Sequence, residues 1–530
     1  DRTPCPSDPD RRRSSGGDRV VRWRLPPVPS RDRADAAAGP ARGDCLCRRG
    51  IARRRLPDRP ARTARPVPRA RKRRAAVGRS GVCRDVARDP GAQTVGRGGA
   101  QSSDPQGARM AVSALSGGAA TAAEAARQAM SEPPLFPPTR AAGLDRLAAF
   151  VPHAGADYAM GRNTDPGPDA PAAVSRLSPY LRYRLLTEQE TAGAVLAKHS
   201  LHACEKYVQE VLWRTYWKGW LEMRPQVWAR FVAERDRQRD AFRDTRAIAD
   251  AEAGRTGIEG FDDWARELVA TGCLHNHARM WFASIWIFTL RLPWALGADF
   301  FLRHLIDADA ASNTLSWRWV AGLQTAGKTY LATADNIARY TNGRFAPKGL
   351  AEQAEPLSEA AMEPAQPVPQ LAPRNPRTPA LLLVTPEDMH PESALPREGD
   401  WRAALIANDD ALLWGDGARA FVRAASADVG VRVTDHFGCS ANPAARLDAA
   451  TLIDAAHQAG ARQIVTAFAP VGPIADALAQ AAPVLAAEGI PLVQVRREWD
   501  DIFWPHARKG FFPFKQQMPR LLAEIGMPGR

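Results

Sequence analysis

Residues 256–330 largely determine the fold, and their sequence is TGIEGFDDWARELVATGCLHNHARMWFASIWIFTLRLPWALGADFFLRHLIDADAASNTLSWRWVAGLQTAGKTY. It contains six Trp residues, and apolar residues recur at spacings of three and four from Ile258 to Leu268. This spacing is typical of an amphipathic helix. From Met280 to Leu290 the chain is apolar on nearly every side, which predicts a helix buried inside the protein.

Polar side chains stand inside or beside this apolar stretch. Because a buried polar group needs a hydrogen-bond partner, each of them is expected to be paired or to hold a ligand. A mixed set of amide, guanidinium and carboxylate groups suits a planar cofactor ring that both donates and accepts hydrogen bonds. The residues of this set are Asn276, Arg279, Asp307, Asp309 and Asn313.

The stretch resembles the flavin-binding helical domain of the DNA photolyase and cryptochrome family. The resemblance covers roughly residues 158–341 and implies an all-helical domain with FAD as its cofactor. Five motifs match those of the family in the right order: SRLSPYL (175–181), EVLWR (210–214), LHNHARM (274–280), LIDADAASN (305–313) and WRW (317–319).

The first motif places two hydroxyls and a guanidinium at an expected helix start. Such a corner offers hydrogen-bond donors and positive charge to a pyrophosphate. Simple capping of the helix by a Ser side chain would give the same sequence pattern. In the family this motif clasps the FAD diphosphate, and the resemblance assigns that role to Ser175, Arg176, Leu177 and Ser178. Tyr158 is the residue expected to touch the flavin nucleotide from upstream.

The resemblance also assigns residues to the flavin ring. Arg279 and Asp307 would form a buried ion pair beside the isoalloxazine, and Asp309 would accept a hydrogen bond from a ring N–H. Asn313 would lie near the redox-active ring nitrogen, and Asn276 belongs to the same cofactor set. Such partners adjust the electronic properties of a flavin.

A second group of residues is expected to face DNA. Glu210, Trp213 and Arg214 share one helical face; they are either an ordinary amphipathic surface or, by the resemblance, part of the lesion pocket. The resemblance places Glu210 and Trp213 against the lesion, and Arg214 against the cofactor or DNA. His277 stands where repair enzymes of the family often have Arg, and no metal is expected at His275-x-His277 without further ligands. Met280 and Trp319 would line the lesion cavity.

Trp317 and Trp294 resemble the proximal and middle members of the family's electron-transfer chain of tryptophans. They could equally be ordinary core aromatics, because ten of the 15 Trp residues fall between positions 213 and 319. The outer member of such a chain has no assignment.

The charge of the chain is unevenly distributed. Residues 1–110 carry 28 Lys+Arg and 11 Asp+Glu, or +17, so the remaining 44 basic and 47 acidic residues give −3. Residues 1–129 have one aromatic residue, Trp23, and are rich in Arg, Pro, Gly and Asp. We therefore expect a disordered basic tail, either a nucleic-acid-binding arm or sequence outside the native mature protein.

The rest of the chain divides into three expected parts. Residues 130–348 form the FAD-binding helical domain, residues 349–378 a Pro-rich linker, and residues 379–530 a smaller α/β domain with a parallel sheet. This last part is similar to the family's antenna domain, but in a rearranged order, and no glycine-rich nucleotide motif follows its strands. Strands are predicted at 380–384, 411–414, 431–434, 463–468 and 491–495.

Taken together, these features predict an FAD-dependent enzyme that uses light to split cyclobutane pyrimidine dimers by electron transfer from reduced flavin. Its partner would be DNA with UV lesions, single- or double-stranded. The alternative is a cryptochrome-like blue-light photoreceptor that signals through a protein partner without repairing DNA. Residues 131–350 carry a net charge of only +3, which is small for a DNA-binding domain, so the charge does not exclude this alternative. Free cysteines and the absence of a long apolar run predict a soluble, cytoplasmic protein that does not contact a membrane.

Overall fold

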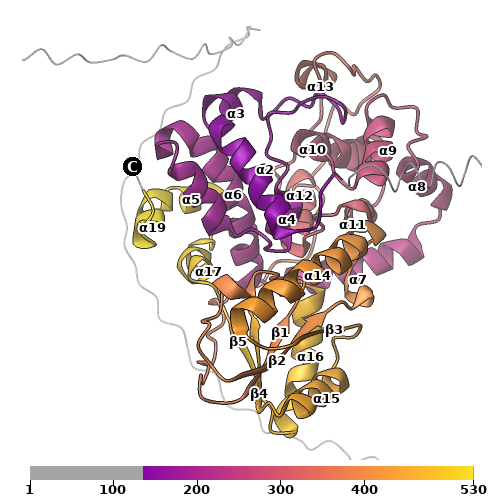
Figure 1. Ribbon diagram of the computed structural model, residues 1–530. Helices are drawn as coiled ribbons and strands as arrows, with labels where there is room; N and C mark the ends of the chain where they lie inside the picture. The colour runs from indigo at the N-terminus through magenta and orange to yellow at the C-terminus, as the bar shows by residue number, and fades with distance from the viewer. Residues whose placement is uncertain (1–134, 529–530) are drawn as a thin grey trace, which may run out of the picture. The chain divides into compact units, whose positions relative to one another are not determined.

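The structure, a computed structural model, describes residues 135–528 (Figure 1). The predicted disordered tail, 1–129, lies outside the described residues. The predicted fold class is confirmed for the rest: a mainly helical region comes first in the chain, and a five-stranded parallel sheet with flanking helices follows. No helix within 135–528 is long and apolar enough to cross a membrane.

The helical region is built around α6 (Leu201–Glu222). Ser200 caps this helix by accepting a hydrogen bond from the backbone N–H of Ala203, and the apolar residues of α6 are buried in one large core. The other helices are α2 (Arg140–Phe150), α3 (Ala156–Gly161), α4 (Ser178–Arg182), α5 (Glu188–Leu196), α7 (Gln226–Ala241), α8 (Thr245–Glu252), α9 (Phe261–Thr271), α10 (Asn276–Ser284), α11 (Trp294–His304), α12 (Ala310–Val320) and α13 (Ala334–Tyr340).

The predicted buried helix is confirmed. It begins as α10 and continues through one turn of π-helix, η2 (Ile285–Thr289). Trp281, Phe282 and Trp286 on this segment are fully buried. An all-round apolar sequence thus lies in the interior, as its pattern requires.

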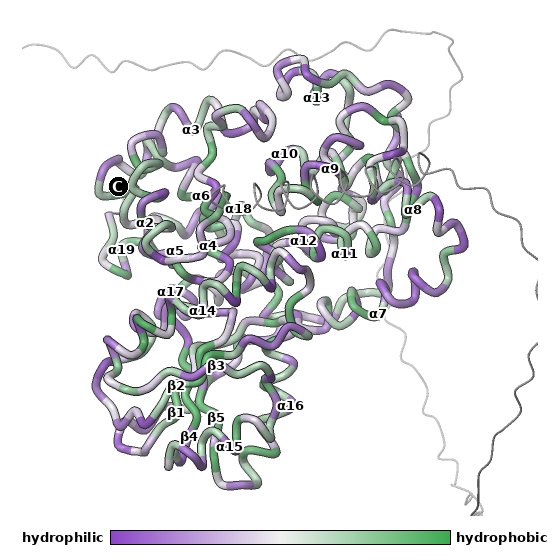
Figure 2. Tube along the Cα trace, turned by 45° about the vertical axis from the view of Figure 1, so that its right-hand side comes forward, coloured by the Kyte–Doolittle hydropathy of each residue, from purple (hydrophilic) through white to green (hydrophobic). Residues whose placement is uncertain are grey.

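The sheet contains β1 (Ala380–Val384), β2 (Trp401–Ala407), β3 (Ala441–Ala444), β4 (Gln463–Ala467) and β5 (Leu492–Val495). All neighbouring strands are parallel, in the order β3-β2-β1-β4-β5. The central strand β1, ALLLV, is wholly apolar and buried, and Figure 2 shows mostly hydrophobic colours at the centre of the sheet. The helices α14 (Asp416–Phe437), α15 (Ala449–Ala459) and α16 (Pro473–Ala487) connect them.

Two of the five predicted strands were wrong. Residues 431–434 lie inside α14, because buried residues at helical spacing, such as Val429, Val433 and Phe437, continue through them. Residues 411–414 overlap the end of a single 3-10 turn, η4 (Asp410–Leu412), and form no strand. The strands β2 and β3 were missed.

The last helices return to the helical region. They are α17 (Glu498–Phe503), η5 (Trp504–His506), α18 (Phe511–Lys515) and α19 (Met518–Glu524). Trp499, Phe503, Phe514 and Leu522 belong to the same buried core as α6. Residues 349–378 contain no helix or strand, and Glu359 from this segment forms an ion pair with the buried Arg318. The domain boundaries predicted at 348 and 379 stay predictions.

Candidate functional site

An ion pair joins the start of α10 to the loop before α12. The Arg279 guanidinium donates through Nε to the carbonyl of Leu274 at 2.9 Å and through a terminal nitrogen to Asp307, the ion pair spanning 3.2 Å. Asp307 is buried. Burial alone would raise the pKa of Asp307, but Arg279 and Arg214 lower it, so the group is ionised. The pair expected from the sequence is present in the structure, and its role toward a flavin stays a prediction.

Asp309 caps α12 and holds a buried group of cations. One carboxylate oxygen accepts a hydrogen bond from the backbone N–H of Ser312 at 2.6 Å. The other lies 3.1 Å from the Lys218 ammonium and 3.7 Å from both Arg182 and Arg214. Burial opposes ionisation, but these cations hold the pKa of Asp309 far below its usual range. Asp309 is therefore a fixed negative charge inside the protein.

The cluster extends into the α/β region through Glu387, which follows β1. Glu387 accepts two hydrogen bonds from Arg182, at 2.8 and 2.9 Å, and lies 3.6 Å from Lys218. The whole cluster contains four cations, Arg182, Arg214, Lys218 and Arg279, against three carboxylates, Asp307, Asp309 and Glu387. A buried nitrogen of Arg214 has no hydrogen-bond acceptor among the described residues. The cluster thus carries excess positive charge that suits an anionic group.

The SRLSPYL segment forms a strained corner before α4. Arg176 has a φ of 50°, in the left-handed region that costs energy for a residue with a side chain. Ser175, Arg176 and Ser178 are half-buried, whereas Leu177 is buried in the core that contacts the sheet. The corner holds the polar side chains partly open to solvent, as the predicted clasp for a diphosphate requires.

The remaining predicted cofactor residues differ in their surroundings. Tyr158 is buried in α3, edge-to-face against Phe150 and Tyr207, and burial raises the pKa of its phenol. The buried Asn313 amide donates to the carbonyl of Ala298 at 2.9 Å. The side chain of Asn276 is exposed at the first position of α10.

Glu210 has a partner that was not predicted from the sequence. Arg162, just after α3, donates to its carboxylate at 2.5 Å. Burial raises the pKa of Glu210, and the Arg162 charge partly offsets this effect. The ring of Trp213 is stacked on Phe511 of α18, with centroids 3.5 Å apart. Both side chains that were predicted to face the lesion therefore have protein partners in this structure.

The other residues of the predicted lesion cavity are half-buried. His277 lies among Tyr340, Trp281 and His275, and its Nδ1 has no partner among the described residues. Burial and the charge of His275 lower the pKa of His277 to about 4, so it is neutral at pH 7. Trp319 is stacked on Tyr330, and Met280 is half-buried in α10.

The two predicted electron-transfer residues lie on neighbouring helices. Trp317 is buried and contacts Trp286 edge-to-face, with centroids 6.3 Å apart. Trp294, at the start of α11, contacts Phe231 at 5.8 Å. Gly297, one turn after Trp294, allows α11 to pack closely against α12, because a Cβ at position 297 would overlap the Trp317 ring. Trp286 is thus a further candidate for the chain that was not predicted from the sequence.

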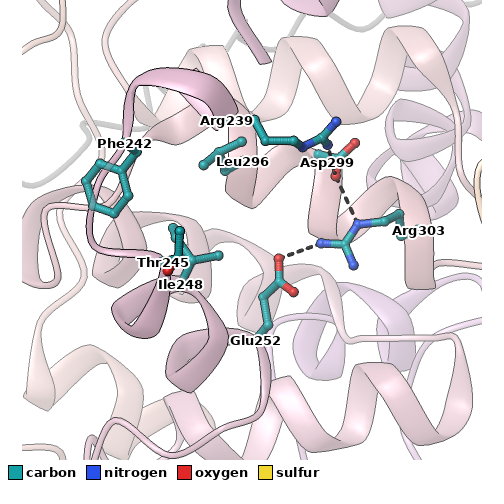
Figure 3. A pocket seen from close by; sticks show the side chains of 8 residues that line it. All are labelled: Arg239, Phe242, Thr245, Ile248, Glu252, Leu296, Asp299 and Arg303. Atoms are coloured by element: carbon teal, nitrogen blue, oxygen red, sulfur yellow. Dashed lines mark hydrogen bonds and ion pairs between the residues drawn. The ribbon is translucent and has the colours of Figure 1, made fainter. Parts of the chain in front are cut away.

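A separate cavity of about 320 Å³ lies among α7, α8 and α11 (Figure 3). Asp299 receives hydrogen bonds from Arg239 and Arg303 in its wall, and Arg303 also pairs with Glu252. The charges of this cavity are therefore balanced by one another. None of the predicted site residues lines it.

Part of the chain is similar to known proteins. Residues 207–350 match the FAD binding domain of DNA photolyase. The chain is similar to the deoxyribodipyrimidine photo-lyase of Streptomyces griseus, 34% identical over 185 residues, which are 35% of this chain and 39% of the relative. The photo-lyase of Thermus thermophilus is also 34% identical, over 196 residues, covering 36% of this chain and 44% of the relative.

Among solved structures, a bacterial class III photolyase from Agrobacterium tumefaciens matches with a TM-score of 0.33 and 27% identity. The match covers 39% of this chain and 45% of that chain. The chain thus spans about two fifths of the length of the relatives that it matches.

Proposed function

We propose, from the match of residues 207–350 to the FAD binding domain of DNA photolyase, that the chain is a light-driven enzyme that splits cyclobutane pyrimidine dimers in DNA. The observation that carries the proposal is the match of residues 207–350, which includes Arg279, Asp307 and Asn313. The relatives are named for the same activity.

The residues of the site fit FAD. The buried cluster has one cation more than it has carboxylates, and a nitrogen of Arg214 lacks an acceptor among the described residues. These features favour an anionic ligand, and the corner at Ser175, Arg176 and Ser178 would hold its diphosphate. FAD, when bound, supplies light absorption and electron donation. Arg279, Asp307 and Asn313 would orient the ring.

Glu210 would act on the substrate side. Burial raises the pKa of Glu210 and Arg162 opposes the rise, so displacement of Arg162 would make the protonated carboxyl group, which can donate a hydrogen bond, more favourable. Donation to a carbonyl of the dimer would stabilise the negative charge that develops there, more in the reacting state than in the ground state. The bound lesion would have to displace Arg162 from Glu210, which leaves the guanidinium free for a nearby phosphate.

The test uses the purified full chain and a UV-irradiated oligonucleotide, single-stranded and then double-stranded. We expect about one FAD per chain to be released on denaturation, and dimers to disappear only in the light. Glu210→Ala should lower the number of dimers split per absorbed photon by about tenfold or more, the scale of one lost hydrogen bond to a charged group, about 1.5–3 kcal/mol. Glu210→Asp should retain part of the yield.

Bound FAD and photoreduction should survive in both variants, because Glu210 is not assigned to the cofactor. A flavin-loaded wild-type protein that photoreduces but splits no dimers would contradict repair of this lesion. A colourless folded protein that FAD cannot reconstitute would contradict the assignment as a whole.

The second candidate is a blue-light photoreceptor without repair activity. It is favoured by the contacts of Glu210 with Arg162 and of Trp213 with Phe511, since both expected lesion contacts are already satisfied within the chain. The same assay separates the two functions, because the photoreceptor would show photoreduction without loss of dimers.

A further inference from the structure

The turn between η5 and α18 has no part in the site described so far. Residues 508–512 read RKGFF. Arg508, Lys509 and Gly510 are exposed, and Phe512 is 75% exposed, whereas Phe511 beside it is buried. A single exposed Phe is unremarkable on a protein surface, but here it adjoins two exposed cations.

Two contacts with α6 and one with Arg224, just after that helix, hold this turn in place. The Tyr216 hydroxyl donates to the carbonyl of Lys509 at 2.8 Å, and Arg224 donates to the carbonyl of Arg508, also at 2.8 Å. The Phe511 ring is stacked on Trp213 with an interplanar angle of 9°. Because α6 binds the backbone and Phe511, the side chains of Arg508, Lys509 and Phe512 are left facing solvent.

Among the described residues, the cations of the turn have no ion-pair partner. Nearby Lys515 pairs with Glu205 and Arg520 with Glu524, but within residues 135–528 no carboxylate lies within ion-pair distance of Arg508 or Lys509. Two free cations beside an exposed aromatic ring match single-stranded nucleic acid, which offers phosphates and planar bases together. An acidic peptide would satisfy the cations but would give the Phe512 ring no planar partner.

The turn borders the candidate site, because Phe511 contacts Trp213, which lies one helical turn from Glu210. We propose that residues 508–512 are a DNA contact at the edge of this site: Arg508 and Lys509 bind backbone phosphates, and Phe512 stacks on an unpaired base. This inference rests on the proposed function, since it takes DNA as the substrate. It adds a contact from the C-terminal part of the chain to those expected from the FAD-binding domain.

A binding experiment with the full chain tests the proposal. The probe is an undamaged fluorescent oligothymidylate of about 16 nucleotides, and binding is measured by fluorescence anisotropy at several salt concentrations. The double variant Arg508→Ala/Lys509→Ala should bind more weakly, and its slope of log K against log salt should be shallower by about 1.4, for two lost phosphate contacts. Phe512→Ala should weaken binding at least fivefold with an unchanged slope, and Phe512→Trp should bind like wild type.

The matched control is Arg397→Ala/Arg462→Ala, which removes the same charge from exposed positions of the α/β region and should keep the wild-type slope. Residues 1–110 are the same in every variant, so their charge does not affect the comparison. Wild-type affinity and slope in all turn variants would overturn the contact and leave repair untouched. A wild-type protein that binds no irradiated oligonucleotide would instead contradict the repair function itself.

Discussion

Trp317 lies one turn beyond Asn313 in α12, in contact with Phe282, Trp286 and Phe301. Its indole N–H has no hydrogen-bond partner among the described residues, so Trp317→Phe loses no hydrogen bond and should fold. We expect this variant to bind FAD but to lose most of its light-driven flavin reduction when an external reductant is present, measured by the absorbance of the oxidised flavin. Unchanged photoreduction would make Trp317 a structural aromatic.

Trp294→Phe and Trp286→Phe, measured in the same assay, identify the next member of the chain. The sequence predicts Trp294, whereas Trp286 is the indole in edge-to-face contact with Trp317. Slower reduction in the Trp286 variant alone would contradict the predicted role of Trp294.

At the scale of single residues, the sequence identified side chains by their motifs but not their distant partners. Arg279 and Asp307 were expected to pair, and they do. Arg162, Lys218 and Glu387 were missed, because each is an ordinary charged residue in its local sequence. The signal that could have found Lys218 is its position on the apolar side of α6, where a buried ammonium needs a carboxylate.

At the scale of elements, the close packing of η5 against α6 leads to a prediction about Gly219. A Cβ added to Gly219 would lie 2.8 Å from the Cα and ring of Trp504, and the backbone there cannot give way as a flexible side chain can. Gly219→Ala should therefore destabilise the protein by about 1–3 kcal/mol, measured by chemical denaturation.

Gly193→Ala in α5 is the matched control. A Cβ there meets only the end of the Met527 side chain, at 3.4 Å, so higher helix propensity should stabilise the protein by about 0.5–1 kcal/mol. Equal effects of the two substitutions would mean that the contact with Trp504 does not constrain α6.

The elements also show where periodicity misleads. Residues 431–434, VRVT, alternate like a strand and contain β-branched residues, but they continue the buried face of α14. The strand β2, WRAALIA, has only one β-branched residue and was missed. Strands β1, β4 and β5 were predicted close to their observed bounds, because short apolar runs bounded by turn residues mark buried parallel strands.

At the scale of the whole molecule, buried polar contacts connect the helical region to later parts of the chain, both to the α/β region and to α17. Arg182 binds Glu387, 205 positions away, and Arg184 binds Asp500, 316 positions away at 2.7 Å. The Trp499 indole also donates to Thr215 on α6 at 3.0 Å. Charged pairs so far apart in the chain leave no local pattern, so the sequence predicted both regions but none of their contacts.

Glu222, at the end of α6, is part of this junction and makes it sensitive to pH. Its carboxylate accepts a hydrogen bond from the backbone N–H of Val471, just after β4, at 2.5 Å. Burial raises the pKa of Glu222 from 4.5 to about 7, although Val471 and Lys218 oppose the shift. Between these values the folded protein binds more protons than the unfolded chain, so the free energy of unfolding falls as pH rises through this window.

Glu222→Gln keeps an acceptor for Val471 and removes the ionisation. The wild type should therefore lose about 3 kcal/mol of stability relative to this variant between pH 4.5 and pH 7, with little further change at higher pH, as measured by chemical denaturation. Glu355→Gln, at an exposed position, should follow the wild type across the same range. If the Glu222→Gln and wild-type curves run parallel instead, Glu222 is not held in its protonated form by the junction, and other buried carboxyl groups must account for any dependence on pH.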